Sequence, residues 1–322
     1  MRKALTGLFV LVLLAAGGAW WALETWRAPG PLAEATAIVV PRGSSQAIAA
    51  ALAEQGVVAD ARFLTAAAWI TRAEGPLRAG EYLFPAQGSL RQVLEVLRRA
   101  RPVQRRLTLP EGLTAKQMVA LIGAAPGMTG ETPAVAEGEL LPETYSYQFG
   151  DNRAALVRRA TQAMNTALER LWKDRVPNLP VATPREALVL ASIVERETGQ
   201  PEERPRVAAV FLNRLKRGMP LQSDPTVAYA AADGAALDRP LSRADLDRDH
   251  PFNTYRVRGL PPGPIASPGE ESLKAVLRPA ETDDLYFVAD GTGGHAFGRT
   301  LEEHNRNVAR WREIERQRAA PK

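Results

Sequence analysis

The chain has 322 residues, of which 45% are hydrophobic and 24% are charged. This composition is typical of a globular protein and excludes a wholly disordered one, and the length allows more than one domain. Cysteine is absent, which excludes disulfides, thiolate nucleophiles and cysteine-ligated zinc. The net charge of +5 fits either a plain solvated surface or attraction to an anionic membrane or glycan. The sequence has no dense basic stretch with interleaved aromatic residues, so we expect no nucleic-acid partner.

The N-terminus carries an uncharged run long enough to cross a membrane. Arg2 and Lys3 precede twenty uncharged residues, Ala4–Leu23, and a helix of that length spans about 30 Å, the thickness of a hydrocarbon core. Two interpretations remain open. The small residues in the run fit a cleaved signal peptide, whereas Trp20 and Trp21 at its end favour an uncleaved anchor. For an anchor, the basic N-terminal tip predicts a cytoplasmic N-terminus and the rest of the chain on the other side of the membrane.

The remaining sequence predicts an α+β protein with a small module followed by a larger, mainly helical domain. The predicted divisions are a cytoplasmic tip and transmembrane anchor, a Pro/Gly/Ala-rich stalk, a small α/β module, a large α+β domain and a tail, at 1–27, 28–35, 36–103, 104–318 and 319–322.

Local signals predict the elements of the small module. Strands alternate with capped helices, because β-branched runs end at Pro or Gly and serines stand before apolar residues at helical spacing. We expect strands at 36–40 and 77–85 and helices at 45–52, 61–71 and 90–97.

The larger domain is expected to begin with a strand at 106–109 and to be mainly helical between 151 and 251. A hairpin of strands at 285–289 and 295–297 and a polar helix at 300–317 should close it. Its histidines lack metal-ligand spacing and the chain has no phosphate-binding loop, so we expect no cofactor and no metal.

One predicted helix carries unusual carboxylates at its end. Thr183–Glu186 is a capping box with proline at the first helical position, and the following run to Val194 is apolar on every side, as in a buried helix. Glu195 and Glu197 fall in the last turn before Gly199, where the helix dipole and partial burial both disfavour an ionised carboxylate. A carboxylic acid that keeps its proton near neutral pH is suited to general acid catalysis.

The two glutamates lie about 200° apart around a helix, so they cannot face one cleft as a close pair. The alternative is that both are ordinary charges at a helix end, paired with nearby arginines. Polar and aromatic residues downstream, on Pro- and Gly-rich loops, suit either sugar binding or turn formation.

Several ordered motifs make the sequence similar to the YceG-like family, the MltG-type endolytic murein transglycosylases. The resemblance covers nearly the whole chain, and the small module resembles the family's LysM-like subdomain. The matching stretches are Leu109–Gly112, Leu141–Tyr145, Ala191–Thr198, Val210–Leu215, Leu221–Thr226, Asn253–Tyr255, Gly259–Gly269 and Leu285–Gly291.

The resemblance implies a lyase that cuts nascent peptidoglycan strands internally, near the peptidoglycan synthases, and so limits strand length. One glutamic acid, here Glu197, would protonate the bond between N-acetylmuramic acid and N-acetylglucosamine and then deprotonate the muramyl 6-hydroxyl, leaving a 1,6-anhydro end. Candidate substrate-binding residues are Glu195, Asn213, Gln222, Asp224, Thr226, Asn253, Tyr255, Glu143 and Tyr145.

One departure concerns the segment after Glu137-Gly138, where the family usually has aromatic residues and this chain has Glu139-Leu140-Leu141. It puts sugar stacking at that wall, and with it the roles of Glu143 and Tyr145, in doubt. Two alternatives remain open: a non-catalytic, membrane-anchored peptidoglycan-binding scaffold, and a hydrolase in which water attacks in place of the 6-hydroxyl.

Overall fold

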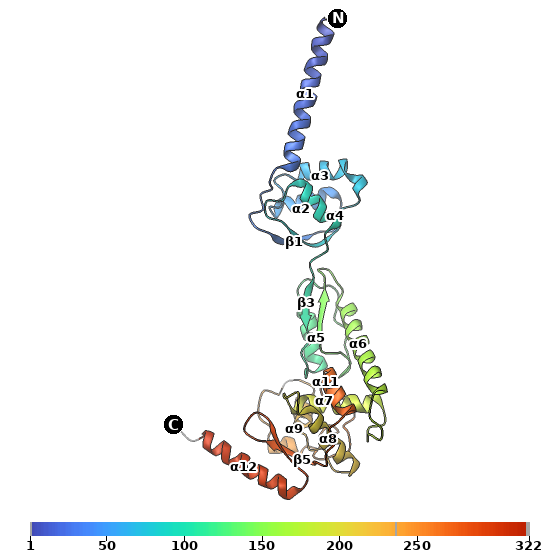
Figure 1. Ribbon diagram of the computed structural model, residues 1–322, viewed down its shortest axis with the longest axis vertical. Helices are drawn as coiled ribbons and strands as arrows, with labels where there is room; N and C mark the ends of the chain where they lie inside the picture. Colours follow the sequence, from blue (N-terminus) through green and yellow to red (C-terminus); the bar gives the residue numbers. More distant parts are fainter. Residues whose placement is uncertain (1, 236, 320–322) are drawn as a thin grey trace. The chain divides into compact units, whose positions relative to one another are not determined.

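The computed structural model describes residues 2–235 and 237–319 (Figure 1). The fold mixes helix and sheet, as predicted, with 49% of residues helical and 9% in strands. Two compact units are distinguished by their internal contacts and are described separately. The first comprises Met1–Arg105, 126–128 and 146–151, and the second comprises 106–125, 129–145 and 152–322. Residues 320–322 of the predicted tail lie outside the described residues.

The first unit contains a long N-terminal helix and a small βααβ core with one further helix. Its elements are α1 (Arg2–Arg27), β1 (Thr36–Val40), α2 (Ser45–Glu54), α3 (Ala61–Ile70), the short 3₁₀ helix η1 (Arg72–Glu74), β2 (Gly80–Phe84) and α4 (Leu90–Arg99). The predicted strands and helices of this region are confirmed. β1 and β2 pair antiparallel, with Ile38 opposite Tyr82, and Ser44, Asp60 and Ser89 cap the helices through side-chain oxygens.

Helix α1 is long and apolar enough to cross a membrane over Leu5–Arg27, and its apolar side chains are exposed. No other helix in the described part of the chain meets the same test. Only the end of the helix, at Trp21 and Trp26, contacts the module, and an apolar helix that is otherwise exposed is the pattern expected of a lipid-facing segment.

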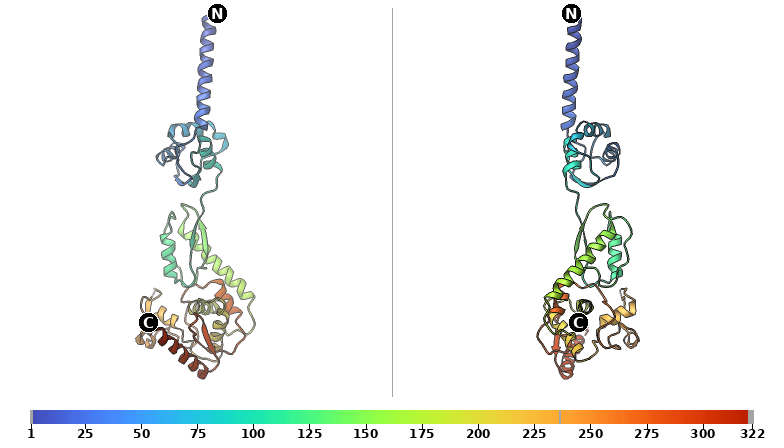
Figure 2. Two further views of the ribbon diagram at one scale, coloured as in Figure 1. Left: turned by 60° about the vertical axis from the view of Figure 1, so that its left-hand side comes forward. Right: turned by 90° about the vertical axis from the view of Figure 1, so that its right-hand side faces the viewer.

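The second unit is mainly helical. Its elements are β3 (Arg105–Thr108), α5 (Ala115–Ala124), β4 (Thr144–Tyr147), α6 (Arg153–Lys173), α7 (Pro184–Glu197), α8 (Arg204–Lys216), α9 (Asp224–Ala232), α10 (Arg243–Asp247), α11 (Glu270–Leu277), β5 (Tyr286–Ala289), β6 (His295–Gly298) and α12 (Leu301–Ala319), the ends of β3 and β4 being assigned to the first unit. β3 pairs with β4, and β5 pairs with β6 as an antiparallel hairpin. Helix α12 packs beside that hairpin (Figures 1 and 2).

Helix α7 occupies the middle of this unit. Every residue from Ala187 to Val194 is buried, and α7 packs against α6, α8, α9 and α11. The prediction of a fully buried helix is therefore confirmed. One buried polar group ties it to the following loop, because the Ser192 hydroxyl accepts a hydrogen bond from the Ile265 amide at 3.0 Å. The rigid core fixes where the carboxyl end of α7 emerges.

The start of α11 is capped by a residue from another helix. The Ser267–Glu270 pattern predicts a capping box, but the N-cap residue is Gly269 and no side chain of its own caps the helix. The Ser267 hydroxyl finds no hydrogen-bond partner among the described residues. Glu195, at the end of α7, instead accepts a hydrogen bond from the Gly269 amide at 2.9 Å, so a tertiary contact replaces the local cap.

Candidate active site

Glu197 is the last residue of α7, Thr198 is its C-cap, and Gly199, the predicted stop, follows directly. The apolar residues that precede it, Ile193 and Val194, are completely buried. The side chain is partly buried at the point where the helix leaves the core. Its carboxyl group therefore sits between an apolar wall and the loops that follow α8.

The Ser223 hydroxyl donates a hydrogen bond of 2.5 Å to Oε1 of Glu197. Ser223 is also the N-cap residue of α9, yet it makes no side-chain capping bond there. A serine at this position normally accepts a hydrogen bond from the first turn of its helix. Here the hydroxyl is directed to Glu197 instead.

The backbone around Ser223 is held by two buried threonines. The Ser223 amide donates to the Thr254 hydroxyl at 2.9 Å, and the Thr226 hydroxyl donates to the Ser223 carbonyl at 2.7 Å. The two threonine hydroxyls also bond to each other at 2.8 Å. Gln222, just before Ser223, has a φ of 53°, a left-handed conformation that non-glycine residues rarely adopt. These bonds hold that turn and fix the position of Ser223.

Arg214, buried on α8, donates hydrogen bonds to the same loop. Its guanidinium donates to the Leu221 carbonyl at 2.7 Å and to the Leu285 carbonyl at 2.7 Å, and lies 3.4 Å from Oε1 of Gln222. The ring of Tyr286 lies 5.2 Å from its central carbon. Burial lowers the pKa of Arg214, but an arginine stays protonated at any physiological pH. A fixed positive charge therefore stands close to Glu197.

Burial raises the pKa of Glu197 to about 7. The hydrogen bond from Ser223 lowers this pKa, the negative charge of Asp224 raises it, and the positive charge of Arg214 lowers it. Desolvation dominates because the ionised carboxylate loses more solvation than these groups restore. Glu197 is therefore close to half protonated at neutral pH, which is the condition under which one group can both donate and accept a proton.

Asp224 and Tyr255 form a second polar pair beside Glu197. The Tyr255 hydroxyl donates to Oδ1 of Asp224 at 2.7 Å, and burial together with this negative partner raises the pKa of Tyr255. Asp224 is exposed, and Tyr255 is 37% exposed, so one part of its ring is covered and another reaches solvent. They present a carboxylate and an aromatic ring to solvent next to the glutamate, a combination suited to hydrogen bonding and stacking on a sugar.

Glu195 faces a different environment, as the helical spacing predicts. One of its oxygens bonds Arg204 at 3.1 Å and the other caps α11 through the Gly269 amide. Arg204 also contacts Glu111 at 3.3 Å. The side chain of Glu195 is only 5% exposed, so this glutamate joins α7, α8 and α11 and has no free edge for a ligand.

The other predicted site residues fall into two groups. Gln222 lies in the Ser223 loop, and Thr226 supports that loop from a buried position. Asn213 and Asn253 donate to backbone carbonyls, Asn213 to those of Thr282 and Asp284 and Asn253 to those of Leu246 and Arg248.

Glu143 and Tyr145 lie on or beside β4, and the structure does not bring them to Glu197. The hydroxyl of Tyr145 donates to the Leu141 carbonyl at 2.8 Å, and burial raises its pKa to about 12. Glu143 is exposed. Sequence reasoning did not single out Ser223, Thr254 or Arg214, although all three stand in or beside the motifs it used.

A cavity of about 240 Å³ lies beside α9, and Arg196, Tyr229 and Thr114 are among its lining residues, whereas Glu197 and Ser223 are not. Next to it, Glu137 accepts hydrogen bonds from the Ala115 amide and the Tyr229 hydroxyl, and burial raises its pKa. Within residues 2–235 and 237–319, no group of three or more His, Asp or Glu side chains is placed to hold a metal ion.

Comparison with known proteins gives consistent matches. The chain is 41% identical over 170 residues to an endolytic murein transglycosylase of Bacillus subtilis, covering 53% of this chain and 46% of that protein. It is 32% identical over 283 residues to an endolytic murein transglycosylase of Streptococcus pneumoniae, covering 72% of this chain and 50% of that protein. The chain thus spans about half the length of these curated relatives.

The crystal structure of a yceG-like protein from Listeria monocytogenes matches with a TM-score of 0.55 and 26% identity, covering 85% of this chain and 98% of that one. The family model of the YceG-like family matches residues 38–310, which include both the small module and the Glu197 site. The chain therefore belongs to the YceG-like family.

Proposed function

We propose that the protein is an endolytic peptidoglycan lytic transglycosylase in which Glu197 alone serves as acid and then as base. The observation that carries this proposal is the glutamic acid at the end of a buried helix, with its pKa raised to about 7 and a serine hydroxyl bonded to it. The names of the two curated relatives support the substrate class.

In the proposed reaction, protonated Glu197 donates its proton to the glycosidic oxygen that leaves with N-acetylglucosamine. The bond from that oxygen to C1 of N-acetylmuramic acid breaks, and the 6-hydroxyl of the same muramyl residue attacks C1. The hydroxyl proton passes to the Glu197 carboxylate, which restores the acid without water. Ser223 would stabilise the transient carboxylate through its short hydrogen bond. The negative charge of Asp224 would stabilise positive charge that develops on the sugar ring.

Asp224 also gives a specific reason to keep a hydrolase as the second candidate. Most glycosidases use two carboxylates, one of which activates water, and Asp224 is close enough to Glu197 to influence its pKa. Its Oδ1 already accepts the Tyr255 hydroxyl, which favours a supporting role. A scaffold without turnover is the third possibility that the experiment below separates.

The proposal includes the setting of the enzyme. Helix α1 would span the cytoplasmic membrane with its N-terminus in the cytoplasm and the second unit in the periplasm, in keeping with its length and apolar character. The module at residues 36–103 would act as a LysM-like glycan-binding unit, in line with its βααβ order. The large domain at 104–318 would cut nascent strands near the peptidoglycan synthases and so limit their length.

The test is mass spectrometry of purified glycan strands incubated with the full chain in detergent or nanodiscs. Wild type is compared with Glu197→Gln, which removes the proton donor with little change of shape. Glu202→Gln, an exposed glutamate five residues away, serves as the matched control and should cut like wild type. We expect internal cuts with 1,6-anhydro ends, reduced by at least about 10³-fold in Glu197→Gln.

The products decide between the three candidates. Ends heavier by one water molecule would make the protein a hydrolase. Strands that bind to folded wild type without being cut would support the scaffold. Equal activity in wild type and Glu197→Gln would refute the assignment of Glu197.

A further inference from the structure

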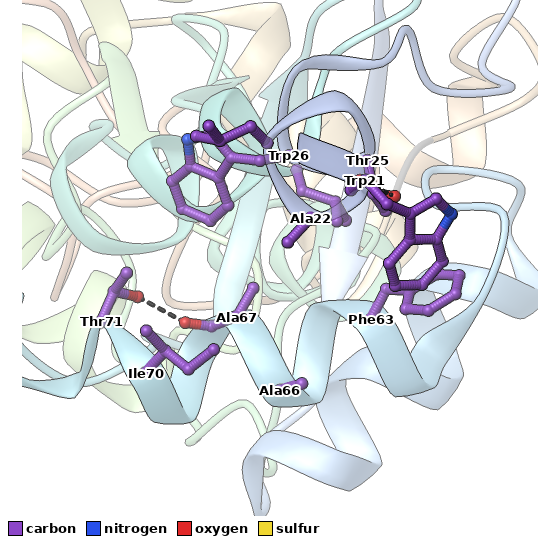
Figure 3. Close-up of a pocket in the computed structure, with 11 residues that line it drawn as sticks. Trp21, Ala22, Thr25, Trp26, Phe63, Ala66, Ala67, Ile70 and Thr71 are labelled. Carbon is purple, nitrogen blue, oxygen red and sulfur yellow. Dashed lines mark hydrogen bonds between the residues drawn. The ribbon is translucent and has the colours of Figure 1, made fainter. Parts of the chain in front are cut away.

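The first unit has an apolar cavity of about 430 Å³ where the end of α1 meets α3 (Figure 3). From α1 it is lined by residues including Trp21, Ala22 and Trp26, and from α3 by Phe63 and Ile70. Trp21 and Phe63 meet edge to face, with ring centroids 5.6 Å apart. The lining contains few polar atoms, so the cavity does not resemble a glycan site, which needs hydrogen-bonding groups.

Helix α3 is apolar on two faces. One face, formed by Leu64 and Ala68, packs into the core of the module. The other carries a stripe at helical spacing that lines the cavity, namely Phe63, Ala66 and Ile70, and the buried Ala67 lies between the two faces. A helix that is apolar on both sides is normally covered on both. Within the described residues, the second face is covered only in part, by the end of α1.

The exposure of this face is large. Ile70 is 69% exposed, the neighbouring Trp69 is 66% exposed and Phe63 is 37% exposed. Exposed large apolar side chains that adjoin one another mark a surface for a partner or a membrane. Four of the six tryptophans of the chain belong to α1 or α3: Trp20, Trp21, Trp26 and Trp69.

The position of the cavity along α1 indicates that lipid is the molecule that fills it. The apolar segment of α1 runs over Leu5–Arg27, and at about 1.5 Å per residue Trp21 and Trp26 fall where such a segment leaves the hydrocarbon. Tryptophans are enriched at that level, where an apolar ring meets the lipid headgroups. Arginines stand at or just after the ends of both helices in the sequence and suit the same level: Arg27 ends α1, and Arg72 follows α3 with its guanidinium 4.5 Å over the Trp69 ring.

We propose that the exposed face of α3 lies on the membrane surface and that the cavity between α1 and α3 takes the acyl chain of a phospholipid from the adjoining leaflet. The inference rests on the proposed membrane span of α1 and extends it. The small module would be fixed to the bilayer at two places, the span and the α3 face.

The absence of cysteine makes a labelling test clean. Single cysteines are introduced at Ile70, at Leu83 and at Leu13 in the full chain, and each carries a nitroxide. All three side chains are more than half exposed, so labelling should not disturb packing. Leu83 is an apolar residue of β2 that does not line the cavity and is the matched control, and Leu13 reports on the span itself. The proteins are reconstituted in nanodiscs of phosphatidylcholine and phosphatidylglycerol.

Electron paramagnetic resonance then compares relaxation of each label by oxygen, which concentrates in lipid, and by a water-soluble nickel chelate. We expect the ratio of oxygen to nickel accessibility to be several-fold higher at Ile70 than at Leu83, and high at Leu13. A low ratio at Ile70 together with a high ratio at Leu13 would refute membrane contact by α3 but leave the span intact.

Two further outcomes would also overturn the inference. A label at Ile70 that neither reagent reaches would mean that protein, such as a second copy of the chain, covers the face. A low ratio at Leu13 would refute the membrane span and the inference that depends on it, while leaving the proposed cleavage at Glu197 untouched.

Discussion

The raised pKa of Glu197 predicts that the acid weakens the fold at neutral pH and that Glu197→Gln removes this effect. A carboxyl group whose pKa is higher in the folded chain than in the unfolded chain binds protons more tightly when folded. Its contribution to stability is fully present below the ordinary glutamate pKa of 4.5, which applies to the unfolded chain, and is lost as pH rises to about 7. Glutamine is neutral at every pH and shows no such loss.

The size of the effect follows from the two pKa values. A shift from 4.5 to about 7 corresponds to about 3 kcal/mol at about 1.4 kcal/mol per unit. Part of the Glu197 side chain reaches solvent, which reduces this figure, so we expect a change of about 1 to 3 kcal/mol. Glu197→Gln should gain this much stability relative to wild type between about pH 4.5 and about pH 7, with no further gain above that range.

Urea unfolding of the full chain in detergent micelles, followed by circular dichroism at several pH values, measures the difference. Glu202→Gln changes the same charge at an exposed position and should show less than about 0.5 kcal/mol of pH-dependent difference. A Glu197→Gln difference that stays constant across the pH range would refute the claim that Glu197 is held in a desolvating environment. This result would not depend on whether the proposed cleavage of glycan strands takes place.

Three further predictions concern the neighbours of the acid. Ser223→Ala removes a hydrogen bond to Glu197. It should shift the alkaline limb of the pH profile of kcat/KM upward by about one pH unit, since a hydrogen bond to a charged group contributes about 1.5–3 kcal/mol. The control is Ser272→Ala, at a buried serine whose hydroxyl has no partner among the described residues, and it should not shift that limb. Asp224→Asn removes a charge that raises the pKa of Glu197 and should move the same limb downward. A shift upward would contradict the conclusion that the negative charge of Asp224 raises this pKa. Glu195→Ala removes the buried carboxylate partner of Arg204, which keeps only the exposed Glu111, and leaves the Gly269 amide uncapped. It should cost about 2–4 kcal/mol of stability in urea unfolding, whereas loss of cutting without loss of stability would argue for a direct catalytic role.

The parts of the fold that local chemistry determines were predictable from the sequence. Ser44 and Ser89 each cap a helix as expected, and Thr183 accepts the Glu186 amide at the start of α7. These signals act within a few residues, so a reader of the sequence has all the information needed. The end of α7 follows the same logic, because the predicted stop, Gly199, comes directly after the C-cap Thr198.

The site itself was only half predictable. The helix dipole and the buried apolar run predict a glutamic acid with a raised pKa at the end of α7, and that prediction needs only the sequence of the helix. The groups that tune its pKa come from other elements: Arg214 from α8, and Ser223 and Asp224 from the start of α9. Thr254, from the loop after α10, holds Ser223 in place. Ser223 precedes Asp224-Pro225, and that pattern favours a helix cap, so its role at Glu197 could not be read from its neighbours.

The same serine shows how stability and function compete at this site. An N-cap serine that bonds its own helix contributes about 1 kcal/mol, and α9 forgoes that contribution because the hydroxyl of Ser223 is turned to Glu197. Gln222 adds a left-handed residue beside it, which costs about 1 kcal/mol more. Buried threonines and Arg214 hold the loop in place against both costs. A loop selected for stability alone would let Ser223 cap α9, so the uncapped helix and the raised pKa of Glu197 are best explained together, as the arrangement that an acid poised near neutral pH requires.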